Sequence, residues 1–156
     1  GNLWEQALQK AGSQDWPREL TVAPPDRCFP GTHRWMSDPA AGLPAWLELR
    51  WPAEVGIAEV VLVFDTGMHR HLTLTQADGY ERRMVWGRPQ PETVRDYGIE
   101  VEGGGAWREI ESVAGNYQRR RVHRWAGITA RALRIVVRAT NGIDHARIGE
   151  VRVYGK

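Results

Sequence analysis

The sequence predicts an all-β fold, an eight-stranded antiparallel β-sandwich of the jelly-roll kind with long loops. The main observation is that apolar and polar residues alternate with a period of two from residue 46 to the end of the chain. Turn residues recur between these segments about every ten residues, which is typical of sandwiches. A length of 156 residues suits one hydrophobic core, so we expect a single domain over residues 1–156.

Each predicted strand is bounded by turn residues. In 97–101 the odd-numbered residues are apolar, and the glycines at 103–105 close a hairpin into the next strand. The run 57–64 is almost wholly apolar, which predicts a strand that is buried on both faces. Seven of the roughly eight expected strands can be placed on the sequence, at 46–49, 57–64, 97–101, 107–113, 119–125, 133–137 and 147–154.

The remaining segments are of two kinds. Between residues 3 and 11, apolar residues recur at helical spacing, which predicts one short helix before Gly12. Residues 14–45 hold six of the nine prolines, and residues 65–95 are rich in aromatic and basic side chains. Loops of this length in a compact domain are usually functional. We therefore expect the functional site on the second long loop.

The composition excludes several classes of protein. With 21 basic and 19 acidic residues the net charge is only +2, which gives no field for non-specific binding of nucleic acid. The longest apolar stretch, 60–64, is far shorter than the roughly 20 residues of a membrane span, and residues 1–12 lack the features of a signal peptide. The single cysteine, Cys28, excludes an internal disulfide framework and a cysteine-rich zinc site.

Motifs of common enzymes are absent from the sequence. It contains no GxSxG, P-loop or GxGxxG pattern, and the glycines at 103–105 are not followed by a predicted helix. His69 and His71 share one face of an extended segment and could hold a metal together, but no third ligand is evident. We therefore expect no catalytic residue, no catalytic metal and no cofactor.

Seven segments stand in an order and at spacings that carry a family resemblance. They are 32–38 (THRWMSD), 44–49 (PAWLEL), 57–64 (IAEVVLVF), 96–101 (DYGIEV), 107–109 (WRE), 132–137 (ALRIVV) and 147–155 (RIGEVRVYG). Over 32–155 the chain thereby resembles the discoidin-like family, also called coagulation factor five/eight type C, which includes the family 32 carbohydrate-binding modules. The resemblance implies a galactose-binding-like jelly roll whose loops at one end bind a ligand.

The resemblance implies a function as well as a fold. The chain is expected to be a non-catalytic carbohydrate-binding module that attaches a larger bacterial enzyme, extracellular or periplasmic, to a glycan or polysaccharide. The alternative is a structural or docking module that packs against the catalytic domain of its parent protein without binding sugar. Residues 115–123 (GNYQRRRVH) also resemble modules at the C-terminal ends of large bacterial proteins, including flavin-dependent oxidoreductases and polysaccharide-degrading enzymes.

Sugar sites of this family combine a histidine or an acid, an arginine, an asparagine and an aromatic platform. The candidate ligand-binding residues that match by position or by loop are His33, Arg34, Arg70, His71, Tyr80, Trp86, Tyr117 and Asn141. A guanidinium or amide group binds two neighbouring hydroxyls at once, which is why such side chains recur in sugar sites. For each candidate the competing interpretation is a residue that braces a loop.

Two further groups of residues carry expectations about their position. Trp35 and Trp46 match the family's core tryptophans and are expected to be buried. In an alternating strand Arg119 and Arg121 share a face, which would line a surface for an acidic sugar or a parent domain, or would simply be solvated.

A structural calcium ion is common in the family, and Thr32 and Glu150 match two of its ligand positions. The loop before Thr32 departs from the family's Asp-Gly pattern and offers few carboxylates, whereas calcium takes about six to eight oxygen ligands. We therefore expect no metal, with Glu150 paired instead to an arginine such as Arg27 or Arg34, because a carboxylate that lies inside the fold needs a cation or several donors.

Overall fold

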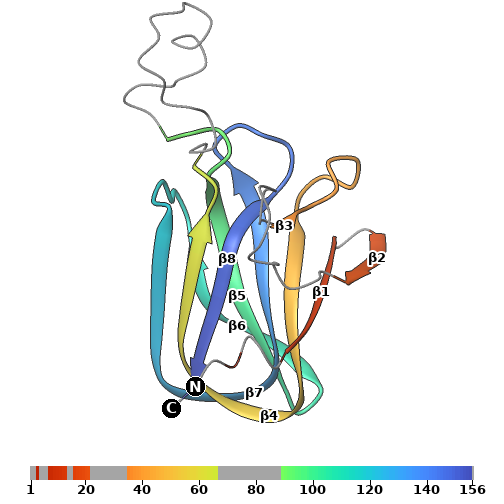
Figure 1. Cartoon of the computed structure of the whole chain (residues 1–156), viewed down its shortest axis with the longest axis vertical. Helices are drawn as coiled ribbons and strands as arrows, with labels where there is room; N and C mark the ends of the chain where they lie inside the picture. The colour runs from red at the N-terminus through yellow and green to blue at the C-terminus, as the bar shows by residue number, and fades with distance from the viewer. Residues whose placement is uncertain (1–2, 4–6, 14–15, 22–34, 67–88, 156) are drawn as a thin grey trace, which may run out of the picture.

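The computed structural model describes residues 3, 7–13, 16–21, 35–66 and 89–155. Within them the chain forms eight strands, and every recorded pairing is antiparallel, which confirms the predicted all-β fold (Figure 1). In this part of the chain no helix has the length and apolarity needed to span a bilayer. The strands are β1 (Leu8–Ser13), β2 (Trp16–Thr21), β3 (Trp35–Met36), β4 (Ala45–Phe64), β5 (Val94–Gly103), β6 (Ala106–Val113), β7 (Arg120–Thr140) and β8 (Arg147–Gly155).

The two longest strands, β4 and β7, connect the layers of the sandwich because each takes part in both (Figure 1). Residues 45–50 of β4 pair with 132–137 of β7, and residues 55–63 pair with 120–130. The strands β2-β1-β4-β7-β5-β6 form one layer, which we call the back sheet. The other halves of β7 and β4, together with β8 and β3, form the front sheet.

The bend in β4 lies at residues 51–54, where its pairing with β7 is interrupted. Pro52 is tolerated here because its missing N–H removes no bond from the ladder. Trp51 is 2% exposed, and its indole N–H donates to the Leu3 carbonyl at 2.7 Å. The Arg131 guanidinium donates to the Pro52 carbonyl at 2.9 Å. These contacts hold the bend from both of its sides.

One apolar core lies between the two sheets. Because side chains alternate along a strand, every second residue faces this core. Examples are Val60 and Leu62 in the front sheet and Ile99 and Val101 in the back sheet, each at most 1% exposed. Trp35 belongs to this core, as predicted. Each fully buried apolar side chain of this size contributes about 1.5–3 kcal/mol, so the core is the main source of stability.

The predicted N-terminal helix is wrong for residues 8–13, which form β1. This strand pairs with the first half of β4, from Leu8 opposite Arg50 to Ser13 opposite Ala45, and with β2 on its other side. A few apolar residues at helical spacing give only a weak local preference. The open edge of β4 offers backbone partners along the whole segment, so sheet pairing overrides that preference.

Trp46 does not lie in the core, contrary to its expected position. Leu47 and Leu49 face the core, so the alternation of β4 turns Trp46 to the outer face of the back sheet. There the Trp46 and Trp107 ring centroids lie 4.2 and 4.0 Å from the guanidinium carbon of Arg134. The two tryptophans therefore hold a cation on the sheet surface, an arrangement worth about 0.5–2 kcal/mol.

The core also contains a hydrogen-bonded polar pair, Tyr97 and His123. The Tyr97 hydroxyl lies 2.6 Å from His123 Nε2, and His123 Nδ1 lies 3.7 Å from a carboxylate oxygen of Glu111. Because Nδ1 faces the carboxylate, we assign the proton to Nδ1, and the Tyr97 hydroxyl donates to Nε2. Burial raises the pKa of Tyr97 to about 12, which keeps that donor proton in place.

His123 is expected to make the stability of the domain fall with acidity. Its pKa is lowered from 6.5, chiefly by burial and also by Arg121, while Glu111 partly offsets the change. Below pH 6.5 the unfolded chain therefore binds a proton that the folded chain does not. The contribution of His123 to the free energy of unfolding should be constant well above this pH and should fall as the pH drops toward the folded-state pKa.

Chemical denaturation at a series of pH values, compared with a His123→Gln variant, tests this prediction. Glutamine keeps an acceptor for Tyr97 but does not titrate, so below about pH 6.5 the variant should have a shallower dependence of the unfolding free energy on pH. Equal slopes for the two proteins would assign the pH dependence to other groups.

Candidate functional site

Four connections between strands meet at one end of the sandwich, which we call the loop end (top of Figure 1). Because neighbouring strands are antiparallel, β4 ends here, β5 begins here, and the β3–β4, β6–β7 and β7–β8 connections lie here. The described residues of these connections are 37–44, 65–66, 89–93, 114–119 and 141–146. The candidate residues Tyr117 and Asn141 therefore share one end of the fold.

Asn116 fixes the β6–β7 connection onto β5. It is 2% exposed, and its amide nitrogen donates to the carbonyls of Val94 at 2.8 Å and Gln118 at 3.1 Å. Its amide oxygen accepts from the Gln118 backbone N–H at 3.2 Å and from the Arg121 guanidinium at 3.4 Å. With its neighbour held in this way, Tyr117 is displayed to solvent and is 65% exposed.

Asn141 ties the β7–β8 connection to two other loops. Its amide nitrogen donates to the carbonyls of Thr93 at 3.0 Å and Asn116 at 3.1 Å. The next residue, Gly142, approaches Pro91 so closely that a Cβ atom would lie 2.9 Å from the proline ring. Asn141 thus braces loops, while its amide oxygen accepts no hydrogen bond within the described part of the chain.

A series of polar side chains crosses the loop end from Asp144 to Asp65. Arg147 donates from Nε to His145 Nε2 at 2.9 Å and from Nη1 to Asp65 at 3.4 Å. Because His145 Nε2 accepts that bond, its proton lies on Nδ1, which faces Asp144 at 2.9 Å. The hydrogen bond from His145 lowers the pKa of Asp144. The exposed Asp144 carboxylate is therefore held in its charged form at the rim.

The described residues include two of the eight candidate ligand-binding residues, Tyr117 and Asn141, and bring both to the loop end. The other six, which are His33, Arg34, Arg70, His71, Tyr80 and Trp86, lie outside the described residues. The sequence reasoning missed Asp65, Asn116, His145 and Arg147. No spacing indicates that Arg147 and Asp65 meet, because 82 residues separate them. Asn116 lies inside the segment 115–123, but nothing in the sequence indicated that its amide group would brace the loop.

Glu150 differs from its expected environment. It lies on β8 opposite Val63 and accepts from Arg152 at 2.6 Å, with 39% of its side chain exposed. Glu150 is thus paired to an arginine, as expected, but this arginine is its strand neighbour Arg152 and the carboxylate lies on the sheet surface rather than inside. Thr32, Arg27 and Arg34 lie outside the described residues. Among the residues that are described, no three His, Cys, Asp or Glu side chains gather to hold a metal ion.

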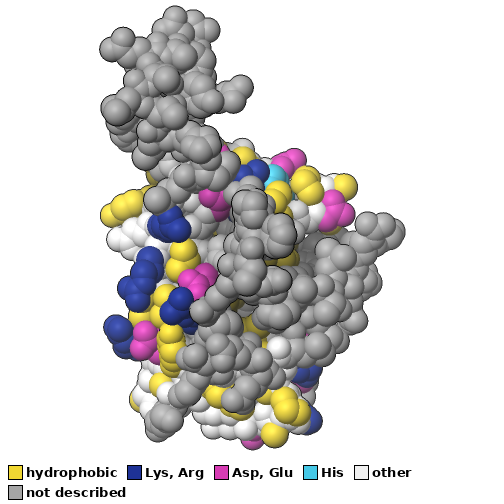
Figure 2. Space-filling model, in the orientation of Figure 1, with side chains coloured by type: hydrophobic (Ala, Val, Ile, Leu, Met, Phe, Trp, Pro, Cys, Tyr) yellow, Lys and Arg dark blue, Asp and Glu magenta, His cyan; other side chains and the backbone are white. Residues whose placement is uncertain are grey.

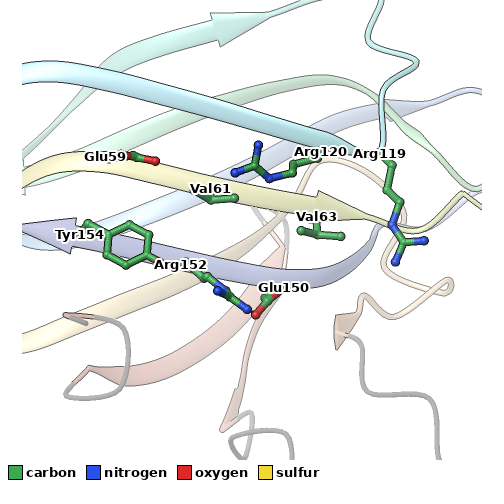
Figure 3. Close-up of a pocket in the computed structure, with 8 residues that line it drawn as sticks. All are labelled: Glu59, Val61, Val63, Arg119, Arg120, Glu150, Arg152 and Tyr154. Carbon is green, nitrogen blue, oxygen red and sulfur yellow. The ribbon is translucent and has the colours of Figure 1, made fainter. Parts of the chain in front are cut away.

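A second feature is a trough of 710 Å³ on the outer face of the front sheet, which we call the sheet-face groove (Figure 3). Its described lining residues are Glu59, Val61, Val63, Arg119, Arg120, Glu150, Arg152 and Tyr154. The strand β4 runs between β7 and β8, and the two valines of β4 are shorter than the side chains on either side. The valines therefore form the floor of the groove, and β7 and β8 supply its walls.

The register of the front sheet decides which arginines face the groove. Val63 lies opposite Arg120 on β7, and both line the groove. Arg121 instead reaches Asn116, so the expectation that Arg119 and Arg121 share this face was wrong for Arg121. Arg119 precedes β7 and does not follow its alternation. Figure 2 shows basic and acidic side chains interspersed with apolar ones on the left of this face.

Comparison with known proteins identifies the class of fold. No family model and no curated protein matches the sequence. In three dimensions the chain has the same fold as solved family 32 carbohydrate-binding modules. It matches the Clostridium perfringens NanJ module, solved with galactose, with a TM-score of 0.65 and 12% identity, over 97% of this chain and 96% of that one.

Two further solved structures extend this finding. The family 32 module of Streptococcus pneumoniae EndoD matches with a TM-score of 0.67 and 16% identity, over 100% of both chains. A structure described as SpGH29 matches with a TM-score of 0.62 and 17% identity, over 100% of this chain but only 28% of that one. The same fold thus occurs both as a separate module and as part of a longer chain.

Proposed function

We propose that this chain is a non-catalytic carbohydrate-binding module that holds its sugar at the loop end. The observation that carries the proposal is the agreement of the fold, over nearly the whole chain, with modules that include one solved with galactose. At 12% identity such a likeness concerns the fold alone, so the choice of site rests on the residues of the loop end.

Those residues match the chemistry of a sugar. The exposed Tyr117 ring offers an apolar surface to the C–H face of a pyranose. The amide oxygen of Asn141, which accepts no hydrogen bond from the described residues, and the Asp144 carboxylate can accept hydrogen bonds from hydroxyls. Because the Asn116 and Asn141 hydrogen bonds order these loops before a ligand arrives, binding costs little additional ordering. The six candidates outside the described residues stay predictions for the same site.

The proposal extends to the setting of the module. We place it in a larger bacterial protein, extracellular or periplasmic, where it keeps a catalytic domain close to its polysaccharide and so raises the effective substrate concentration. The alignment of this whole chain with 28% of a longer one supports such an arrangement. Under the alternative, in which the module only docks on its parent, the isolated chain would bind no glycan.

Retention of the chain by an array of galactose-terminated and other neutral glycans tests the proposed function. We expect Tyr117→Ala to weaken binding about tenfold, since loss of one stacked ring costs about 1.4 kcal/mol. Tyr154→Ala, which removes an aromatic ring from the sheet-face groove, is the matched control and should leave neutral glycan binding unchanged. Absence of binding to every glycan, or equal losses in the two variants, would contradict the proposal.

A further inference from the structure

The sheet-face groove has an excess of positive charge. Its described lining and its neighbour Arg124 supply four guanidinium groups against the two carboxylates of Glu59 and Glu150. Arg124 pairs with Glu59 at 3.4 Å, and Arg152 pairs with Glu150 at 2.6 Å, so both carboxylates are already neutralised. Arg120 is exposed and makes no hydrogen bond or ion pair within the described residues. A cationic donor therefore remains available at the wall of the groove.

The floor and the opposite wall are suited to a sugar ring. Val61 and Val63 form an apolar strip along β4, and the Tyr154 ring stands on β8 beside it (Figure 3). Hydrogen bonds from Arg152 to Glu150 and Tyr154 raise the pKa of Arg152 and hold this wall together. The groove thus combines an apolar floor, an aromatic ring and the guanidinium of Arg120, which has no partner among the described residues. These groups match the C–H face and the carboxylate of a uronic acid.

We propose that the sheet-face groove is a second binding surface, separate from the loop end, for a polysaccharide chain that carries carboxylates. The chain lies along β4, with its sugar rings over the valine floor and its carboxylates against Arg120. A groove whose floor runs along a strand suits a polymer, because successive sugar rings can contact Val61 and Val63 in turn. The proposal does not depend on the sugar site at the loop end.

An acidic peptide is the less favoured occupant. Peptides commonly bind sheets by adding a strand at an open edge, where main-chain N–H and C=O groups are free. Along the floor of this groove both edges of β4 are paired, with β7 on one side and β8 on the other. Recognition must therefore come from side chains alone, and the apolar floor favours sugar rings over a polar peptide backbone.

Affinity electrophoresis of the full chain in gels that contain polygalacturonate tests the proposal. The same polymer after methyl esterification is the matched ligand, because it keeps the sugar rings and loses the charges. We expect retardation by polygalacturonate only, and a loss of affinity of about tenfold or more in Arg120→Ala, the size of one charge-assisted contact. Arg108→Ala removes another exposed arginine, from β6, and should change little.

Several results would contradict the second binding surface. No retardation by polygalacturonate, or equal losses in Arg120→Ala and Arg108→Ala, would overturn the proposal, the second because it indicates attraction by overall charge. A loss of affinity for polygalacturonate in Tyr117→Ala but not in Arg120→Ala would mean that the uronate binds at the loop end, which would also overturn the proposal. Stronger binding of polyglutamate than of polygalacturonate would favour the peptide. Because neutral glycans are measured separately, failure of the loop-end site would leave the polygalacturonate result unchanged.

Discussion

Replacement of Glu48 by alanine is expected to lower the free energy of unfolding by about 3 kcal/mol, the lower end of the range for a buried ion pair that loses one partner. Glu48 is 2% exposed and accepts from Arg50 at 3.1 Å and from Arg134 at 2.9 Å. Arg134 in turn lies against the rings of Trp46 and Trp107. Without the carboxylate, two partly buried guanidinium groups lose their shared acceptor.

The measurement is equilibrium unfolding in urea, with Glu100→Ala as the matched control. Glu100 lies opposite Arg134 across the neighbouring strand pair, but no hydrogen bond or ion pair is recorded for it within the described residues. Its removal should cost less than about 0.5 kcal/mol, as for an ordinary surface substitution. If both variants lose the same small amount, the network on the back sheet does not stabilise the fold in the way described.

Replacement of Asn116 by alanine is expected to cost about 2–3 kcal/mol and to weaken sugar binding as well, because its buried partners lose their hydrogen bonds. The amide group joins the Val94 and Gln118 carbonyls, the Gln118 N–H and the Arg121 guanidinium. The loss of stability should lower the melting temperature by several degrees. The freed 114–119 loop would then present Tyr117 in many conformations, which raises the ordering cost of binding.

Gln118→Ala is the matched control for this prediction. Within the described residues, Gln118 contributes only backbone groups to the hydrogen bonds of this loop, and its side chain is exposed. It should therefore melt and bind like the parent chain. A normal melting temperature for Asn116→Ala would show that the loop is ordered by other contacts.

The fold could be predicted from the sequence because apolar and polar residues alternate along most of the strands. The alternation in 97–101 and 133–137 marks residues that do face the core. The predicted strands 46–49 and 57–64 proved to be one continuous strand, since the chain passes Pro52 at a break in the ladder and continues into the second sheet. A local pattern contains no information about such a bend, which depends on pairing with β7.

The site was less predictable, because its contacts join residues far apart in the sequence. Asn141 was identified by its place on the last loop. Tyr117 was identified by its presence in the run 115–123. The ion pair of Arg147 with Asp65 and the bracing by Asn116 depend on which strand ends meet. The wrong face for Arg121 arose because alternation was counted from Arg119, one residue before the strand begins.

The most direct test of the central claim is a backbone NMR titration of the full chain with galactose, the sugar bound in the NanJ structure. The account predicts that amide shifts change at 114–118 and 141–146, at the loop end. They should stay constant at 103–106 and 126–129, which lie at the opposite end of the sandwich. Shift changes confined to that opposite end, or none with galactose or with any other glycan retained on the array, would contradict a sugar site at the loop end.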